Sequence, residues 1–214
     1  MTLHRLRGLF LRAGAASPLI AIGCMLLAWA AYPGFNSATQ YLSELGGPKA
    51  PHPIFFNMGL IAVGIGGAIA GLGFAIAVPA LGGARWAGGL VALCFFAAAV
   101  GLIAGLVFPW PDPRHNLIQL GLGIQIAPLA LLWALRRAGG LSGLRRFLAV
   151  AAGIMLVLTV LTKHLVWPNL VNGDNVGWWE RVYAIVLVSW GGVAAFLIER
   201  RLIALAEAAE PAGA

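Results

Sequence analysis

The stretch IFFNMGLIAVGIGGAIAGLGFAIAVPA, residues 54–80, decides the fold class, because it is a long apolar run without a charged side chain. At a rise of about 1.5 Å per residue, a helix of this length crosses a hydrocarbon core of about 30 Å. Further runs long enough to do the same lie at 17–33, 87–108, 116–135, 147–167 and 179–199. The sequence therefore predicts an all-α integral membrane protein, a bundle of six transmembrane helices.

The composition of the whole chain agrees with this prediction. Of its 214 residues, 61% are hydrophobic and only 10% are charged, whereas a soluble domain of this length carries far more charge. Cys24 and Cys94 lie inside apolar runs, where they are expected to act as small buried hydrophobes, which excludes a secreted disulfide scaffold. We expect one membrane domain over residues 1–214.

Basic residues are distributed unevenly between the two sides of the predicted bundle. The side that holds the N-terminus has ten: Arg5, Arg7, Arg12, Arg85, Arg136, Arg137, Arg145, Arg146, Arg200 and Arg201. The other side has only Lys49, Arg114, Lys163 and Arg181. This positive-inside bias predicts cytoplasmic termini and a multi-pass protein of the cell membrane, specifically a bacterial inner membrane.

The same arginines indicate which partners the protein binds. They are expected to set topology and to touch anionic lipid head groups, so membrane lipids are the expected partners and nucleic acid is not. A homo-oligomer or a membrane-protein partner stays open. A cleaved signal peptide is an alternative interpretation of the first run, since AWA at 28–30 follows a basic start, but its loss would leave five spans and break the charge pattern.

Reactive side chains gather on the outward side, whereas the cytoplasmic connections 81–89 and 136–146 contain mainly arginine and glycine. We therefore expect any site to open outward. Within the spans, Gly59, Gly66 and Gly73 form a heptad stripe that predicts close helix packing and carries no information about substrate.

The first outward loop contains NSATQYLSELGG at 36–47. Ser37 and Gln40 fit a capping box, and Gly46-Gly47-Pro48 supplies a stop, which predicts a short interfacial helix over 38–45. Leu42 and Leu45 would share its apolar face with Ala38 and Tyr41. Either the opposite face, with Ser43 and Glu44, is solvated, or it turns inward as one wall of a polar pocket.

Two further outward segments carry candidate chemistry. In FPWPDPRHNLIQ at 108–119, Asp112 is placed to orient His115 as a general base, with Gln119 one turn below; alternatively Asp112 caps a helix and His115 lies in the interface. In GWWERVY at 177–183, Glu180 and Arg181 begin a span, where charges are costly unless paired. Arg181 is suited to bind a phosphate or carboxylate, or to pair with Glu44, Asp112 or Glu180.

The spacing of histidine, serine and glycine residues does not support a metal site, a catalytic triad or a phosphate loop. His52, His115 and His164 would suit catalytic zinc, but no two share a helix at ligand spacing, so no metal is expected. A Ser43 nucleophile activated by His115 lacks a nucleophile elbow. Because the glycine-rich stretches lie in spans or turns rather than after strands, none is a phosphate loop, and no cofactor is expected.

Several motifs together resemble domain-of-unknown-function family nine-nine-eight, a family of six-helix prokaryotic membrane proteins: YLSELG at 41–46, FFNMGL at 55–60, GLVFPWPD at 105–112, HNL at 115–117 and GWWER at 177–181. The resemblance spans nearly the whole chain. It implies site positions Ser43, Glu44, Asn57, Asp112, His115, Asn116, Trp179, Glu180 and Arg181. The connection between Asp112 and His115 is shorter than in many members, and the family has no assigned activity. A more distant likeness to Frag1/DRAM-type membrane proteins implies lipid as the ligand.

These observations lead to three functional hypotheses. In the first, a lipid-modifying or hydrolytic membrane enzyme uses His115, Asp112, Glu44 and Ser43 catalytically and binds substrate through Arg181, Glu180, Asn116, Asn57 and Tyr41. In the second, a non-catalytic lipid-binding or partner protein uses the polar cluster to lock helix ends. In the third, the protein is a small-solute or proton-coupled transporter. The middle of the spans contains almost no ionisable groups, which argues against this hypothesis.

Overall fold

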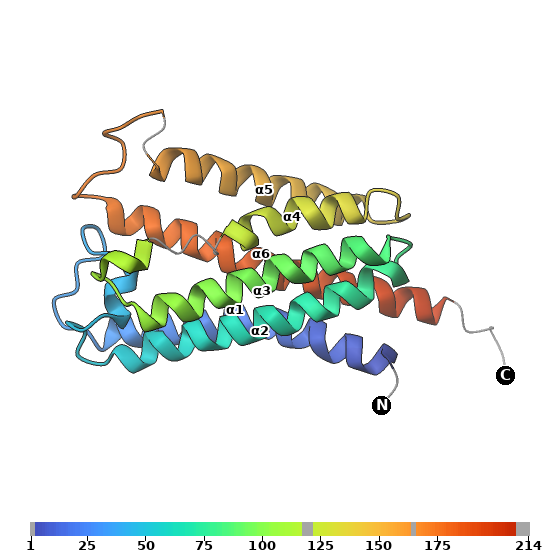
Figure 1. The fold of residues 1–214 in the computed structure, drawn as a ribbon, viewed down its shortest axis with the longest axis horizontal. Coiled ribbons are helices and arrows are strands. Elements are labelled where there is room, and N and C mark those ends of the chain that lie inside the picture. Colours follow the sequence, from blue (N-terminus) through green and yellow to red (C-terminus); the bar gives the residue numbers. More distant parts are fainter. Residues whose placement is uncertain (1–2, 117–121, 164–165, 209–214) are drawn as a thin grey trace.

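The computed structural model describes residues 3–116, 122–163 and 166–208, and within them the fold is entirely helical (Figure 1). Two 3-10 helices, η1 and η2, lie in the connections. The α-helices and 3-10 helices are α1 (Leu3–Ala30), η1 (Leu42–Gly46), α2 (Pro53–Ala80), α3 (Arg85–Val107), η2 (Pro113–Asn116), α4 (Leu122–Ala134), α5 (Ser142–Thr162) and α6 (Val176–Glu207).

Five of these α-helices are long and apolar enough to cross a membrane, and α4 is a shorter apolar helix over the residues described. Large apolar side chains point away from the bundle, for example Leu19, Leu93 and Leu156, each more than 60% exposed. Exposure of this kind suits contact with lipid rather than water. The predicted helical membrane bundle is confirmed. Residues 117–121 of the predicted fourth span, Gln119 among them, lie outside the described residues.

The helices extend beyond the predicted spans at both ends of the chain. Helix α1 begins at Leu3 rather than at residue 17, and α6 continues to Glu207 rather than ending at residue 199. At about 1.5 Å per residue, their 28 and 32 residues give lengths of about 42 and 48 Å, more than the hydrocarbon core needs. Hydropathy detects only the part of a helix within hydrocarbon, and arginine is a good helix former outside it.

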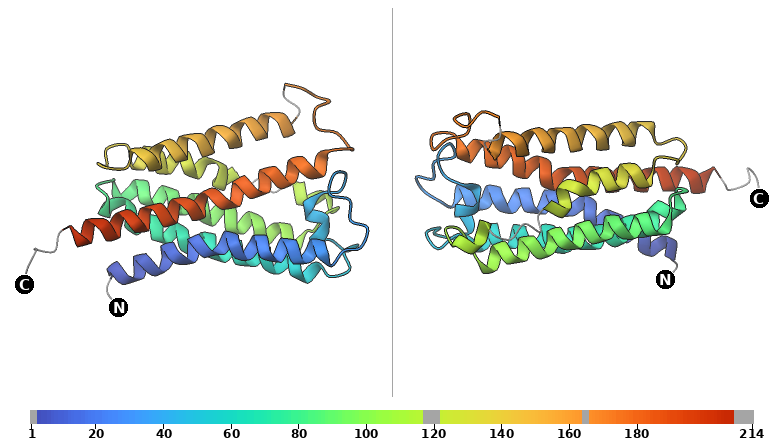
Figure 2. Two further views of the ribbon diagram at one scale, coloured as in Figure 1. Left: turned by 180° about the vertical axis from the view of Figure 1, so that it is seen from behind. Right: turned by 45° about the horizontal axis from the view of Figure 1, so that its top comes forward.

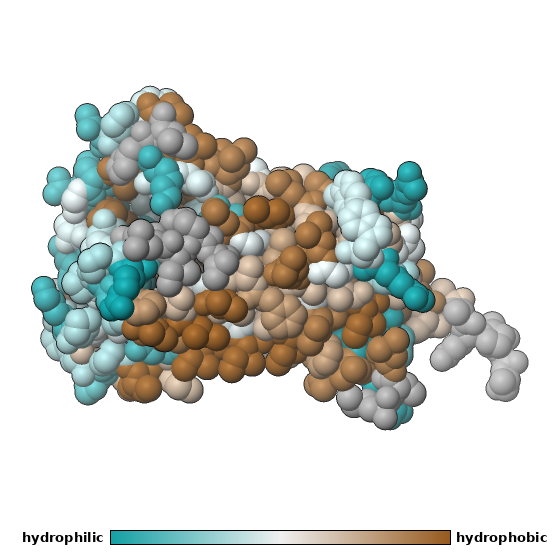
Figure 3. Space-filling model, in the orientation of Figure 1, coloured by the Kyte–Doolittle hydropathy of each residue, from teal (hydrophilic) through white to brown (hydrophobic). Residues whose placement is uncertain are grey.

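The helices form an elongated bundle in which α1, α2 and α3 lie side by side, α4 and α5 form a second group, and α6 runs between the two groups (Figures 1 and 2). The connections α1–α2, α3–α4 and α5–α6 lie at one end, which we call the polar end. The opposite end, the arginine-rich end, holds both termini (Figure 1). Hydrophilic surface marks both ends, with a hydrophobic band between them (Figure 3).

Small residues allow the helices of the first group to pack closely. A Cβ atom built on Gly59 would lie 2.9 Å from Cys24 Cβ, one on Gly66 would lie 2.7 Å from Ser17 Oγ, and one on Gly73 would lie 3.1 Å from Leu11 Cδ2. The predicted glycine stripe of α2 therefore faces α1, and substitution there would force the two helices apart.

The first loop differs in detail from the predicted helix over 38–45. Its regular part is the 3-10 helix η1, Leu42–Gly46, and residues 37–40 form turns instead. The predicted capping box of Ser37 and Gln40 is wrong: the side chain of Asn36 accepts the backbone N–H of Ala38 at 2.9 Å, and Gln40 Oε1 accepts the backbone N–H of Asn36 at 2.8 Å. An Asx turn thus starts the segment one residue earlier. Leu42 and Leu45 are buried, as predicted.

Candidate functional site

A cavity of about 240 Å³ lies at the polar end, which we call the polar cavity. Its walls come from four regions that are distant in sequence: the first loop, the α3–α4 connection, the end of α5, and the α5–α6 connection with the start of α6. The residues that line it are Tyr41, Ser43, Trp110, His115, Thr162, Val171, Val176, Trp179, Glu180 and Tyr183. Five of the predicted site positions therefore meet here.

His115 is held in a defined orientation by the backbone. Its Nδ1 lies 2.8 Å from the carbonyl oxygen of Phe108. Because a carbonyl oxygen can only accept, Nδ1 carries the hydrogen, and in the neutral ring Nε2 presents a lone pair. The described residues provide no hydrogen-bond partner for Nε2. The Trp110 ring stands edge-on to the imidazole, with the ring centres 6.3 Å apart.

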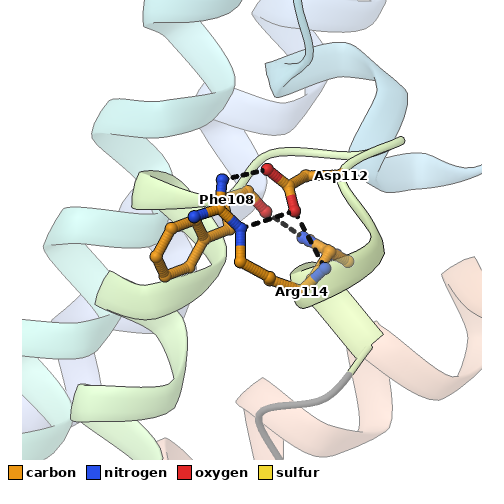
Figure 4. Close-up of polar contacts among 4 residues, drawn as sticks. Phe108, Asp112 and Arg114 are labelled. Carbon is orange, nitrogen blue, oxygen red and sulfur yellow. Dashed lines mark hydrogen bonds and ion pairs between the residues drawn. The ribbon is translucent and has the colours of Figure 1, made fainter.

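Asp112 does not orient His115, so the predicted Asp112–His115 pair is wrong. The carboxylate accepts hydrogen bonds from the Arg114 backbone N–H at 2.8 Å, from Nε at 3.0 Å and from Nη2 at 2.7 Å (Figure 4). The Arg114 guanidinium also lies 4.1 Å from the centre of the Phe108 ring. These hydrogen bonds lower the pKa of Asp112 to about 2 and raise the pKa of Arg114. Asp112 therefore caps the start of η2, in line with the alternative interpretation.

Glu180 connects α6 to the first loop. Its carboxylate accepts a hydrogen bond from the backbone N–H group of Leu42, at the start of η1. Such charge-assisted bonds are stronger than neutral ones and satisfy donors that a helix start leaves free. The side chain thus has a structural role and also contributes charge to the wall of the polar cavity.

Arg181 makes the reciprocal contacts with carbonyl oxygens. Its Nη1 donates to the backbone oxygens of Ser37 at 2.9 Å, Gln40 at 3.2 Å and Gly177 at 2.7 Å, and the guanidinium lies 5.2 Å from the Phe35 ring centre. Within the described residues, Arg181 forms no ion pair, and its buried Nη2 has no hydrogen-bond partner. It does not line the polar cavity. Its contacts anchor the first loop. The predicted ion pair with Glu44, Asp112 or Glu180 does not form among the described residues, and the binding of a phosphate or carboxylate stays a prediction.

The remaining predicted positions divide between the cavity wall and its support. Tyr41 and Ser43 line the polar cavity. Glu44 instead accepts the backbone N–H of Tyr41 at 2.9 Å and the side-chain amide of Gln40 at 3.0 Å, so its carboxylate is used within the loop. Asn57 donates to the carbonyl oxygen of Gly46 at 3.4 Å from below η1. The Asn116 side chain and His164 lie outside the part that the structure describes.

Three hydroxyl residues near the cavity were missed as site positions by the sequence analysis. Thr162 and Tyr183 line the cavity, and Tyr183 Oη lies 3.1 Å from Thr159 Oγ1. Thr159 Oγ1 donates to the carbonyl oxygen of Met155 at 2.8 Å and lies 3.4 Å from Gln125 Oε1, so these contacts bring α6, α5 and α4 together. The available signal was the position of Tyr183 one turn below Glu180, on the same face of α6.

An apolar cavity of about 170 Å³ lies deeper in the bundle, lined by residues such as Phe95, Leu187 and Gly191. On α6, Glu180, Tyr183, Leu187 and Gly191 follow one another at helical spacing, so one face of the helix passes from the polar cavity to the apolar one. No group of three potential metal ligands comes together among the described residues.

Taken together, the fold and the site define a multi-pass helical membrane protein with a polar cavity at one end of its bundle. Residues 15–197 match the sequence model of the family described as Protein of unknown function (DUF998), and the chain belongs to this family. No curated protein and no solved structure matches the chain. The family resemblance predicted from the motifs is confirmed, and the likeness to Frag1/DRAM-type proteins stays a prediction.

Proposed function

We propose that this protein is a membrane enzyme that carries out acid–base chemistry on the polar part of an amphiphilic substrate, such as a lipid. One observation carries the proposal: His115 is fixed through Nδ1 by the Phe108 carbonyl and lines a cavity with hydroxyl and carboxylate groups. A fixed imidazole with one nitrogen free to exchange a proton is the usual general acid or base of enzymes.

The roles of the cavity residues follow from their chemistry. Nε2 of His115 takes a proton from the attacking group and returns it to the leaving group. Glu180 lies in the same wall and stabilises the imidazolium that forms, because an opposite charge favours the protonated ring. The Ser43 hydroxyl group is placed to donate a hydrogen bond to the substrate, and the Tyr183 hydroxyl group, whose hydrogen is directed at Thr159, is placed to accept one.

An amphiphilic substrate suits the arrangement along α6. A polar head in the polar cavity would place an apolar tail toward Leu187 and Gly191, where the second cavity begins. An apolar cavity of about this size accommodates a small hydrocarbon group. From the excess of arginine at the opposite end, we propose that the polar end faces away from the cytoplasm.

The test compares the native protein with His115→Asn in nanodiscs that contain phosphatidylethanolamine, phosphatidylglycerol, cardiolipin and acyl lipids, with lipid species followed by mass spectrometry. Asparagine keeps an N–H donor near the Nδ1 position and removes Nε2. His52→Asn is the matched control, since His52 is exposed at the same end and does not line the cavity. We expect a loss of turnover of about 100-fold or more for His115→Asn only. Equal turnover by the native protein and this variant would overturn the proposal.

A second candidate function, a non-catalytic lipid-binding or partner protein, is favoured by the contacts of Glu180 and Arg181. Both side chains form hydrogen bonds with the backbone of the first loop, as expected of groups that hold helix ends together. The variants Arg181→Gln and His115→Asn, assayed side by side, distinguish the two candidate functions. If Arg181→Gln lowers the melting temperature and neither variant changes lipid turnover or cellular phenotype, the second candidate is supported.

A further inference from the structure

A third cavity, of about 410 Å³, lies at the arginine-rich end between the first turns of α1 and the last turns of α6. We call it the basic cavity. Helix α1 contributes His4, Arg5, Arg7 and Arg12 to its lining, and α6 contributes Glu199 and Leu202. None of these residues takes part in the polar cavity, which is at the opposite end of the bundle (Figure 1).

The charges that line the basic cavity are not balanced. Glu199 is the one acidic side chain in the lining as described, and its Oε1 lies 2.5 Å from Arg12 Nε. The described residues therefore leave Arg5 and Arg7 without a carboxylate partner. The cavity carries an excess of positive charge in a site that is open to an anion.

Arg7 makes this imbalance costly. Its side chain is only 8% exposed, and its Nη2 donates to His4 Nδ1 at 2.8 Å. A histidine side chain carries no negative charge, so this hydrogen bond does not compensate the charge of the guanidinium. A buried charge is unfavourable unless it is paired, and guanidinium groups pair well with the oxygens of phosphate.

The depth of the basic cavity in the membrane can be worked out from helix length. About 20 residues cross the hydrocarbon core, so a span that starts at Ala30 and runs back along α1 reaches Leu11. A span that starts at Trp179 reaches Ile198. Arg5, Arg7 and Glu199 then lie just outside the hydrocarbon, at the level of lipid phosphates. Basic pockets between transmembrane helices at this level bind anionic head groups.

We propose that the basic cavity binds a phosphate group, held by Arg7 from the buried wall and by Arg5 at the mouth. Leu202 and its apolar neighbours form a side of the cavity that suits the glycerol and acyl part of an anionic phospholipid. A phospholipid and free phosphate share the recognised chemistry. This inference does not depend on the proposed function.

The test measures lipid retention by native mass spectrometry on the full chain in detergent, with phosphatidylglycerol and phosphatidylcholine as probes. The variants are Arg7→Gln, Arg7→Lys and Arg5→Gln. Arg5 is exposed, so its substitution leaves the fold intact even if Arg7→Gln does not fold. Arg200→Gln is the matched control, because Arg200 is an exposed arginine at the same end that lies over the Phe196 ring and does not line the cavity.

We expect the native protein to retain phosphatidylglycerol in preference to phosphatidylcholine. Arg7→Gln and Arg5→Gln should each reduce that retention by about tenfold, the loss expected for one charged hydrogen-bonding partner, with Arg7→Lys in between and Arg200→Gln unchanged. Equal retention of both lipids, or an equal loss with Arg200→Gln, would overturn a phospholipid as the ligand.

A parallel melting experiment with inorganic phosphate separates the two sources. Stabilisation of the native protein but not of Arg5→Gln, without retention of phosphatidylglycerol, would support a site for free phosphate. If neither probe distinguishes the native protein from Arg5→Gln, the phosphate site itself is overturned.

Discussion

The carboxylate of Glu180 accepts a hydrogen bond from the backbone N–H of Leu42, although 138 residues separate the two in sequence. Arg181, the next residue, donates to the backbone oxygens of Ser37 and Gln40. Two adjacent charged side chains of α6 therefore provide both the acceptor and the donor that the first loop needs. The polar cavity keeps its shape because the last helix holds the first loop in place.

Replacing Glu180 should separate its structural role from its charge. In Glu180→Ala the N–H group of Leu42 loses its acceptor, which should cost about 1–3 kcal/mol of stability. Glu180→Gln keeps an acceptor oxygen and should stay closer to the native protein. Thermal melting in detergent and limited proteolysis of the first loop measure both effects. Equal stability of the alanine variant and the native protein would show that the loop is held in another way.

At Gly177 the backbone of α6 lies directly against the backbone of the first loop. Its N–H donates to the carbonyl oxygen of Ala38 at 2.8 Å, and a Cβ atom there would lie 2.5 Å from the Ser37 oxygen and would also clash with the Gln40 oxygen. These are backbone atoms, so Gly177→Ala should lower stability by about 1–3 kcal/mol, as overpacking does. Gly173→Ala is the control, because nothing lies within 4 Å of its Cβ position. A similar melting temperature for both variants would contradict the described docking.

The ion pair of Asp112 and Arg114 predicts a specific pH dependence. The pKa of Asp112 in the fold is about 2, below its ordinary value of 3.8, so the stabilisation is fully present above about pH 4 and is lost as the pH falls through 2. The difference in melting temperature between native protein and Asp112→Asn should be constant at neutral pH and should shrink only in that acidic range. A difference that already changes near neutral pH would rule this assignment out.

The tautomer of His115 can be observed directly. Because Nδ1 donates to the Phe108 carbonyl, nitrogen NMR at a pH where the ring is neutral should show a protonated Nδ1 and an unprotonated Nε2. His115→Ala identifies the signal by its absence. The opposite tautomer would mean that Nε2 is a donor in the cavity and would remove the general base from the proposed mechanism.

The orientation in the membrane is testable with single cysteines in a chain whose Cys24 and Cys94 are replaced. Lys49 precedes α2 and Arg137 follows α4, and both are exposed. The α1–α2 and α4–α5 connections that contain them lie at opposite ends of the bundle (Figure 1). We expect a membrane-impermeant maleimide to label Lys49→Cys in intact cells and to label Arg137→Cys only after permeabilisation, as the arginine distribution predicts. The reverse pattern would place the polar cavity on the cytoplasmic side.

The fold was largely predictable because hydropathy reports directly on the solvent that a helix faces. The predicted stretch at 54–80 differs from α2 by one residue, because α2 begins at Pro53. The polar loop before Pro53 marks where the apolar run begins. The prediction failed at the start of α1 and the end of α6, where helices continue beyond hydrocarbon on charged residues. It also placed the fifth span at 147–167, whereas α5 runs from Ser142 to Thr162 and so begins and ends earlier. Hydropathy carries no information about those turns.

The site was predictable in its residue types and not in its pairings. Tyr41, Ser43, His115 and Glu180 meet in the polar cavity, as the crowding of polar groups on one side indicated. The partner of Asp112 depended on a tight 3-10 turn that brings Arg114 back to the carboxylate. Sequence spacing alone does not resolve such a turn. Thr162 and Tyr183 were not assigned to the site because single hydroxyl groups disappear in an average over an apolar span.

The hydrogen bonds between the first loop and α6 also determine the order in which parts of the protein can fold during synthesis. The ribosome delivers α1, the first loop and α2 to the membrane long before α6 has been synthesised, and until then the groups bound by Glu180 and Arg181 must be hydrated. The nascent chain therefore completes its extramembrane structure only after translation of residues 176–181. A chain truncated before that point would present a first loop without the hydrogen bonds to Glu180 and Arg181.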